Sequence, residues 1–327
     1  MFAFIIQRLF QAVLVMLVVA FVSFALFQFV GDPINNMVGQ DATEAQREAL
    51  RERLGLNDPI PIQFFNFVSN AAQFQFGLSY RLGIPVEDII AQRLPATIEL
   101  VLVSAVIALA VGVPMGVYTG LNRHSPLSKI FLTISLIGIS LPTFLIGILL
   151  ILIFGVWLAW LPTFGRSGTV DLGWWETSFL TLQGWRALIL PGITLALFQL
   201  TLIMRLVRAE MLEVLRTDYI KFARARGLSN RAIHFGHALK NTLVPVITII
   251  GLQIGSLLAF SIITETVFAW PGMGLLIIQA IQFADIPVMS SYLVLIALFF
   301  VLINLIVDLL YYVVDPRLRA ERGGGGH

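Results

Sequence analysis

Charged residues and cysteine are what this sequence has least of. Asp, Glu, Lys and Arg make up 12% of the 327 residues, whereas soluble domains average about 25%. The hydrophobic share is 58% and the mean hydropathy is +0.89, so the composition predicts an all-α integral membrane protein and excludes an ordinary soluble domain. The absence of cysteine excludes disulfides, thiolate nucleophiles and cysteine-ligated metals.

Lysine is also scarce, and its positions exclude a phosphate loop. Such a loop ends in Gly-Lys-Ser/Thr, and none of the three lysines, Lys129, Lys221 and Lys240, follows a glycine. A phosphate loop for ATP hydrolysis is therefore excluded, and any ATP-driven activity of this chain would need another subunit. His234 and His237 are three residues apart in a basic segment without a flanking carboxylate, so they predict no metal site.

Six apolar segments are long enough to span a membrane. The third, Ile130–Leu161, is too long for one perpendicular crossing and too short for two, so we expect one tilted helix kinked at Pro142. We interpret the first as a retained span, because its apolar region is too long for a secretory signal and its exit lacks a cleavage pattern. The predicted spans are Leu9–Val30, Ala96–Leu121, Ile130–Leu161, Ala187–Val207, Thr242–Thr264 and Ser291–Val314. In the fifth, the small residues of GLQIGS predict close helix packing.

Basic residues set the expected orientation. With both termini inside, the cytoplasmic segments hold fourteen Lys and Arg and the longer external segments hold seven, which follows the excess of cations in cytoplasmic loops. Residues 31–95 then form an external segment. There Thr43 and Gln46 predict a capping box that opens an amphipathic helix to Leu54. The nearby aromatic residues are expected to pack against the spans or the membrane surface: Phe64, Phe65, Phe67, Phe74 and Phe76.

Few ionisable residues lie within the predicted spans. Ion-coupled carriers usually need such groups near the middle of the membrane, but Glu99 and Glu265 lie near the outer ends of their spans. Only Asp308 lies clearly inside an apolar segment. An ion-coupled carrier or channel that acts alone is thus the alternative to a subunit driven by another protein.

The longest polar interval between apolar segments in the second half of the chain runs from Arg205 to Asn241. It carries eight Lys and Arg against three Asp and Glu, which predicts a cytoplasmic location. Thr217 or Asp218 can cap a helix that ends at Ala225, Gly227 can close it in a left-handed conformation, and Ser229 can cap the next helix.

The helical period predicts one face for docking. Tyr219, Phe222, Ala223 and Arg226 are spaced to share a face, while Lys221 and Arg224 point elsewhere. A short capped helix with an aromatic face suits contact with a soluble partner. The alternative is a basic connector that lies on anionic lipid, although lipid binding alone does not require two capped helices. Tethering at both ends disfavours nucleic-acid binding.

Three stretches carry a resemblance to a known family. The segments DYIKFARARGLS, HALKNTLVPVIT and TETVFAWPGMG resemble the dipeptide and oligopeptide permease subunits of binding-protein-dependent ABC importers. The resemblance implies a type I ABC importer permease fold, in which the polar interval is a coupling helix held in a groove of an ATPase subunit. Lys221 and Phe222 replace the glutamate and first alanine of the family's motif. The residues expected to contact the ATPase are Asp218, Tyr219, Phe222, Ala223, Arg224, Arg226, Gly227 and Leu228.

The resemblance also implies partners and a second site. A second permease subunit, two ATPase subunits or domains and an external solute-binding protein are expected, with ATP and magnesium bound by the ATPases and no cofactor bound by this chain. The sequence WPGMG predicts a type II turn with Pro271 and Gly272 at its centre. By resemblance this turn belongs to an outer loop near the external gate, with Trp270, Pro271, Gly272 and Gly274 as its residues.

The domain organisation follows from these expectations. Residues 1–95 form the first span and the external segment, and residues 96–315 form the permease core with the coupling loop 205–241. Residues 316–327 form a cytoplasmic tail, whose final GGGGH resembles an appended linker and the beginning of an affinity tag.

Overall fold

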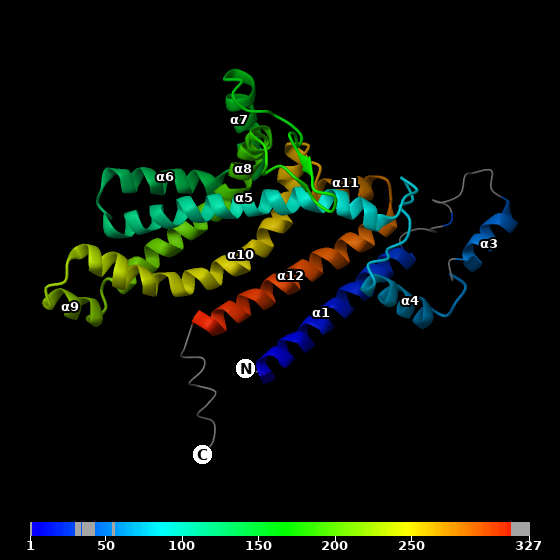
Figure 1. Ribbon diagram of the computed structural model, residues 1–327, viewed down its shortest axis with the longest axis horizontal. Helices are drawn as coiled ribbons and strands as arrows, with labels where there is room; N and C mark the ends of the chain where they lie inside the picture. Colours follow the sequence, from blue (N-terminus) through cyan, green and yellow to red (C-terminus); the bar gives the residue numbers. More distant parts are fainter. Residues whose placement is uncertain (1, 30–33, 35–42, 54–55, 315–327) are drawn as a thin grey trace, which may run out of the picture. The chain divides into compact units, whose positions relative to one another are not determined.

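The fold is almost entirely helical (Figure 1). The computed structural model describes residues 2–29, 34, 43–53 and 56–314. The side chain of Asp308 and the predicted tail 316–327 lie outside the described residues. The helices are α1 (Phe2–Phe29), α3 (Glu44–Arg53), α4 (Ile60–Ala72), α5 (Val86–Leu121), α6 (Pro126–Ser140), α7 (Thr143–Leu150), α8 (Leu182–Val214), α9 (Asp218–Ala225), α10 (Leu239–Val267), α11 (Met273–Gln282) and α12 (Ile286–Val314). The π-helical turns η1 (Ile151–Trp157) and η2 (Ala232–Ala238) precede strand β1 (Val170–Asp171) and α10, respectively, and β1 pairs antiparallel with β2 (Glu176–Thr177).

The chain divides into two compact units. The first comprises residues 1–95, 173–175 and 271–302, and the second comprises residues 96–172, 176–270 and 303–327. Segments distant in sequence therefore meet within each unit, and α5 and α12 each contribute to both.

Aromatic packing organises the described part of the first unit. Helix α4 lies against α1, where the ring of Phe64 meets Phe21 and Phe24 at centroid distances of 5.9 and 5.5 Å. Phe67 lies 5.9 Å from Phe24. The packing prediction is thus confirmed for Phe64 and Phe67 but not for Phe65, whose ring is largely exposed.

The predicted capping box at the start of α3 is confirmed. The backbone N–H of Thr43 donates to Oε1 of Gln46 over 3.0 Å, and the backbone N–H of Gln46 donates to Oγ1 of Thr43 over 3.4 Å. This reciprocal pair satisfies the backbone N–H of Thr43 and adds to the bond that the N–H of Gln46 makes with the carbonyl of Thr43 over 3.0 Å.

Helix α8 is central to the second unit, where it packs against α6, α7 and α10. Its N-cap is Thr181, whose hydroxyl accepts from the backbone N–H of Gly184 over 2.9 Å. The core on its inner side contains residues from α5, α8, α9, η2 and α10. Because Met204, Val207 and Met211 are fully buried, α8 stays packed for about one turn beyond the predicted end of the span at Val207.

A stripe of glycines brings α5 close to α8. Gly112, Gly116 and Gly120 recur every four residues and so share one face of α5. A Cβ atom added at Gly116 would lie 2.6 Å from Cβ of Val207 and 2.8 Å from the carbonyl oxygen of Met204. The predicted close approach at GLQIGS is confirmed at Gly251 on α10, where an added Cβ would overlap the side chain of Val307 on α12.

The prediction of one kinked helix over the third apolar segment is wrong. The chain breaks at Pro142 as expected, but α6 and the α7–η1 helix meet at 111°. A proline kink leaves one bent helix, whereas here Leu141 ends α6 in an extended conformation and Pro142 is the N-cap of α7. Among the described residues, four helices are long and apolar enough to span a membrane, and the bent pair would provide a fifth.

We expect Gly116→Ala to destabilise the protein. The new methyl group meets backbone and a β-branched side chain, so overpacking should cost about 1–3 kcal/mol. Thermal unfolding of the purified protein measures the loss. Gly236→Ala is the matched control, because a Cβ there meets nothing within 4 Å and alanine favours helix by up to about 1 kcal/mol. Equal midpoints for the two variants would contradict the close approach of α5 and α8.

Candidate functional site

Helix α9 occupies the middle of the basic interval, with the predicted bounds. Thr217 is its N-cap, but the hydroxyl donates to the carbonyl of Val214 over 2.6 Å instead of accepting from the helix. Gly227 has the predicted left-handed conformation, with φ +78°. Its N–H donates to the carbonyl of Arg224 over 2.9 Å, and the N–H of Leu228 donates to that of Ala223 over 3.3 Å. These two bonds form a Schellman motif that ends the helix.

The next helix also begins as predicted. The hydroxyl of Ser229 accepts from the backbone N–H of Ala232 over 3.3 Å, which caps the helix that continues through η2 into α10. Helix α9 is therefore a separate turn-bounded element between two long helices.

The inner face of α9 belongs to the protein core. Ile220 is 0% exposed and Ala223 is 7% exposed, and both join a buried cluster with Ile233 and Ala238. The predicted grouping of Ala223 with the exposed aromatic residues is therefore wrong. Ile220 and Ala223, three residues apart on the helix, form the buried face because they pack in the same cluster as η2.

The outer face of α9 is aromatic and basic. Phe222 is 64% exposed and Tyr219 is 42% exposed, while the guanidinium of Arg226 lies 5.7 Å from the Phe222 ring. The hydroxyl of Tyr219 accepts from Nδ2 of Asn241 over 2.7 Å, which links α9 to the start of α10. Because this bond and the Schellman motif hold α9 in place, the helix presents the Phe222 side chain in a fixed position to its surroundings.

Charges around α9 are mostly positive. Lys221 pairs with Asp218 over 2.8 Å, but both are highly exposed, so the pair contributes little to stability. Burial and, secondarily, the positive charge of Arg224 lower the pKa of His234 below its usual range. The imidazole is consequently neutral at neutral pH, and the positive charge of this face comes from arginine and lysine.

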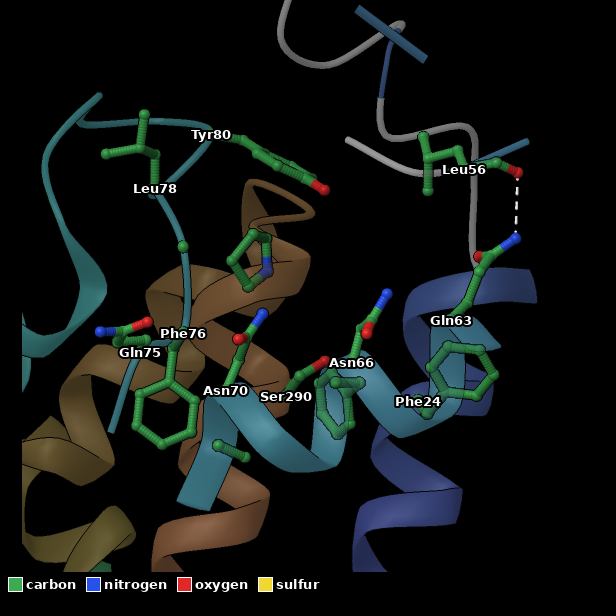
Figure 2. Close-up of a pocket in the computed structure, with 14 residues that line it drawn as sticks. Phe24, Leu56, Gln63, Asn66, Asn70, Gln75, Phe76, Leu78, Tyr80 and Ser290 are labelled. Atoms are coloured by element: carbon green, nitrogen blue, oxygen red, sulfur yellow. Dashed lines mark hydrogen bonds between the residues drawn. The ribbon is translucent and has the colours of Figure 1, made fainter. Parts of the chain in front are cut away.

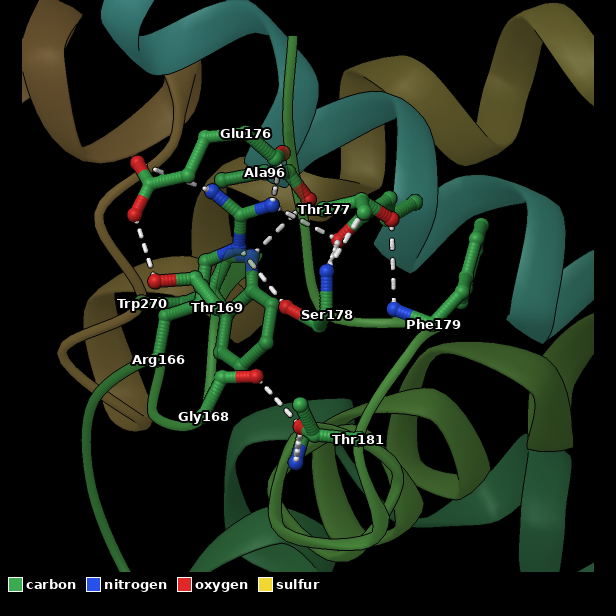
Figure 3. A network of polar contacts seen from close by, with 12 residues as sticks. Ala96, Arg166, Gly168, Thr169, Glu176, Thr177, Ser178, Phe179, Thr181 and Trp270 are labelled. Atoms are coloured by element: carbon green, nitrogen blue, oxygen red, sulfur yellow. Dashed lines mark hydrogen bonds and ion pairs between the residues drawn. The ribbon is translucent and has the colours of Figure 1, made fainter. Parts of the chain in front are cut away.

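A buried ion pair fixes the loop that precedes α8 (Figure 3). The guanidinium of Arg166 lies 2.8 Å from a carboxylate oxygen of Glu99 on α5, with side chains 3% and 0% exposed. Arg166 Nε donates to the hydroxyl of Ser178 over 2.9 Å, and its Nη2 donates to the carbonyl of Glu176 over 2.5 Å. Glu99 also accepts from the backbone N–H of Ser178. Each charge thus has several partners, as burial requires.

The predicted outer-loop residues do not form a type II turn. Gly272 has φ −102° and is the N-cap of α11, whereas the third residue of that turn needs positive φ. Ala269 instead takes the positive φ, 47°. Trp270 is fully buried, and its indole N–H donates to the carbonyl of Ala96 over 2.9 Å. Gly272 and Gly274 are also buried, and Pro271 is half-buried.

The buried carboxylates near the outer ends of the predicted spans have partners. Glu99 is paired with Arg166, and Glu265 accepts from the hydroxyl of Thr97 over 2.6 Å. Neither is a free carboxylate of the kind that a proton relay uses. Sequence reasoning noted Glu99 but missed Arg166, because 67 residues separate them and no local pattern joins them.

The arrangement defines a class of protein: a helical membrane protein in which a short, capped helix between two long helices presents an aromatic residue outward. A solved chain of the MetNI methionine ABC transporter, in inward-facing conformations, has this fold, with a TM-score of 0.54 and 20% identity over 69% of this chain and 96% of that chain. Residues 112–320 match the family described as binding-protein-dependent transport system inner membrane component. Residues 1–101 match the corresponding N-terminal family. The chain belongs to this family and is an inner membrane permease component of such a system.

Similar full-length proteins support the same assignment. The dipeptide transport system permease protein DppB of Alkalihalophilus pseudofirmus is 37% identical, covering 98% of this chain and 100% of that protein. The di/tripeptide transport system permease protein DppB of Pseudomonas aeruginosa is 38% identical, covering 98% and 100%. The oligopeptide transport system permease protein AppB of Bacillus subtilis is 38% identical, covering 97% and 99%. The resemblance expected from the three sequence stretches is confirmed.

Proposed function

We propose that this chain is the membrane permease subunit of an ATP-driven importer of peptides and forms half of the translocation path. The observation that carries the proposal is the full-length similarity to permeases named for dipeptides, di/tripeptides and oligopeptides. Because the sequence lacks a phosphate loop, ATP hydrolysis is assigned to other subunits. The partners are a second permease subunit, two ATPase subunits or domains that bind ATP and magnesium, and an external solute-binding protein.

The proposed topology has six spans with both termini in the cytoplasm. To the four long apolar helices and the bent pair it adds α10, a continuous helix of 29 residues. The excess of Lys and Arg in residues 205–241 then places α9 on the cytoplasmic side, within reach of an ATPase. Residues 31–95 are external, residues 96–315 form the core, and residues 316–327 are cytoplasmic.

In the proposed mechanism α9 couples the ATPase to the spans. Asp218, Tyr219, Phe222, Arg224, Arg226, Gly227 and Leu228 contact the ATPase, and Ala223 supports them from the buried side. Since Ile220 and Ala223 pack in the same core as α5, α8 and α10, a displacement of α9 must move that core. Closure of the ATPases on ATP would therefore reorient the spans by alternating access. Trp270, Pro271, Gly272 and Gly274 belong to the region of the external gate.

We expect Gly227→Val to uncouple ATP hydrolysis from uptake. A left-handed conformation costs a residue with a Cβ atom about 1–2 kcal/mol, so the Schellman motif should open and release the end of α9. The measurement is peptide uptake and ATP hydrolysis by the complete complex in proteoliposomes. Gly236→Val is the control, because Gly236 has no atom near an added Cβ and no positive φ. Unchanged uptake by Gly227→Val would count against the coupling role.

The alternative function, a carrier that acts alone, makes the opposite prediction for the isolated chain. Proteoliposomes that contain only this polypeptide should show no uphill peptide uptake, with or without a proton or sodium gradient. Adding the partner subunits and ATP should restore uptake. Gradient-driven uptake by the isolated chain would overturn the proposed function.

A further inference from the structure

A cavity of about 320 Å³ lies within the first unit. Its volume is at the lower end of the range for ligand sites, about 300–1,000 Å³. Helices α1, α4 and α12 and the segment after α4 all contribute to it (Figure 2). The lining residues are Phe24, Leu56, Gln63, Asn66, Phe67, Asn70, Ala71, Gln75, Phe76, Gly77, Leu78, Tyr80, Pro287 and Ser290.

Among the residues that the structure describes, the lining combines aromatic rings with carboxamides and holds no Lys, Arg, Asp or Glu. Gln63, Asn66 and Asn70 follow one another on one face of α4, and the amides of Asn66 and Asn70 rise from the same side of the helix (Figure 2). A carboxamide offers both donors and an acceptor. Gln63 donates to the carbonyls of Leu56 and Asp58 over 3.0 and 2.7 Å, so Asn66 and Asn70 are the two that match a ligand with alternating C=O and N–H groups. The lack of cations disfavours a phosphate headgroup, and the lack of any charge disfavours free termini.

The cavity wall is fixed in place by a second polar cluster. The carboxylate of Asp285, just before α12, accepts a hydrogen bond from the hydroxyl of Ser79 and one from the backbone N–H of Tyr80 over 3.1 Å. The guanidinium of Arg81 stacks 3.8 Å from the centre of the Phe283 ring. The loop that carries Leu78 and Tyr80 is thus held against the helix that carries Pro287 and Ser290. A wall held in this way is preorganised, which lowers the entropic cost of binding.

We infer that this cavity binds an uncharged, extended stretch of peptide through its main-chain amides and one apolar side chain. The carboxamides of Asn66 and Asn70 bond the main chain, and the rings of Phe24, Phe67 and Phe76 enclose the side chain. The inference rests on the proposed function, because an external face of a peptide importer meets such stretches in two forms: the transported peptide and a loop of the solute-binding protein. Both present the same chemistry to the cavity.

The test uses the complete importer in nanodiscs. Calorimetric titration with the capped tripeptide N-acetyl-Ala-Phe-Ala-amide should show binding, and the capped analogue Ala-Asp-Ala should bind much more weakly. Asn70→Leu should weaken the binding by about two- to tenfold, since losing a hydrogen bond costs about 0.5–1.5 kcal/mol. Gln73→Leu is the matched control. Gln73 is an exposed carboxamide at the end of the same helix that does not line the cavity and bonds locally to Ser69.

A second arm distinguishes the two sources. Association of the purified solute-binding protein is measured with wild type and with both variants. If Asn70→Leu weakens only the binding of the tripeptide, the natural occupant is the transported peptide. If it weakens the association of the solute-binding protein, the natural occupant is a loop of that protein. Each result supports the cavity as a peptide site. If Asn70→Leu and Gln73→Leu behave alike in both arms, or if Ala-Asp-Ala binds as well as Ala-Phe-Ala, the inference is overturned. ATP-dependent uptake in the same preparation tests the proposed function separately, because normal wild-type uptake would leave that function intact.

Discussion

Arg166→Met is expected to cause the largest loss of stability among the changes considered for this protein. Removing one partner of a buried ion pair typically costs about 3–5 kcal/mol, because the other charge stays buried without compensation. Here the abandoned group is the carboxylate of Glu99, which is 0% exposed. The variant would also lose the bonds from Arg166 to Ser178 and Glu176, so the loop before α8 should detach from α5.

Thermal unfolding of the purified protein, followed by near-UV circular dichroism, measures this loss. Arg186→Met is the matched control, since Arg186 is an exposed arginine on α8 and its replacement should leave the midpoint nearly unchanged. The double variant Glu99→Leu with Arg166→Met should recover much of the stability, because no charge remains buried. Equal midpoints for Arg166→Met and Arg186→Met would show that the ion pair does not hold the loop.

Phe222→Ala is expected to abolish most transport while leaving the chain folded. The ring is 64% exposed, so its removal takes little from the core. Aromatic anchors in protein interfaces often contribute about 2 kcal/mol or more, which corresponds to about thirtyfold in affinity. If α9 docks on an ATPase through this ring, ATP-dependent uptake should fall steeply and the ATPase subunits should co-purify less well.

Two further variants separate docking from folding. Phe65→Ala removes another exposed ring, on α4, and should leave co-purification of the ATPase unchanged. Ile220→Ala removes a buried side chain from the opposite face of α9 and should lower the unfolding midpoint, since such truncations cost about 2–5 kcal/mol. Normal uptake and normal ATPase recovery by Phe222→Ala would refute docking through the outer face.

Local signals in the sequence predicted helix boundaries well. The bounds of α9, the left-handed Gly227, the cap at Ser229 and the capping box at Thr43 each depend on residues within one helical turn. The faces of α9 were harder to predict, because spacing shows which residues share a face but not which face is buried. Ile220 and Ala223 are buried by contacts with η2, which lies beyond the turn.

Features that depend on distant contacts were predicted least well. The apolar length of Ile130–Leu161 fitted one tilted helix, while packing against α8 accommodates two helices at 111°. The ion pair between Arg166 and Glu99 left no local trace. By contrast, the glycines at 112, 116 and 120 are spaced four residues apart, which is a known pattern of close helix packing. This spacing could have indicated the contact with α8.

The ion pair between α5 and the later loop also constrains the order of biogenesis. Glu99 is synthesised 67 residues before Arg166, so a nascent chain that ends between them contains the carboxylate without its counter-ion. Burying the Glu99 carboxylate without a counter-ion would be costly. The outer end of α5 can therefore reach its final packing only after Arg166 has been made and has folded back. Completion of this part of the fold therefore lags behind the synthesis of the outer end of α5 by at least 67 residues.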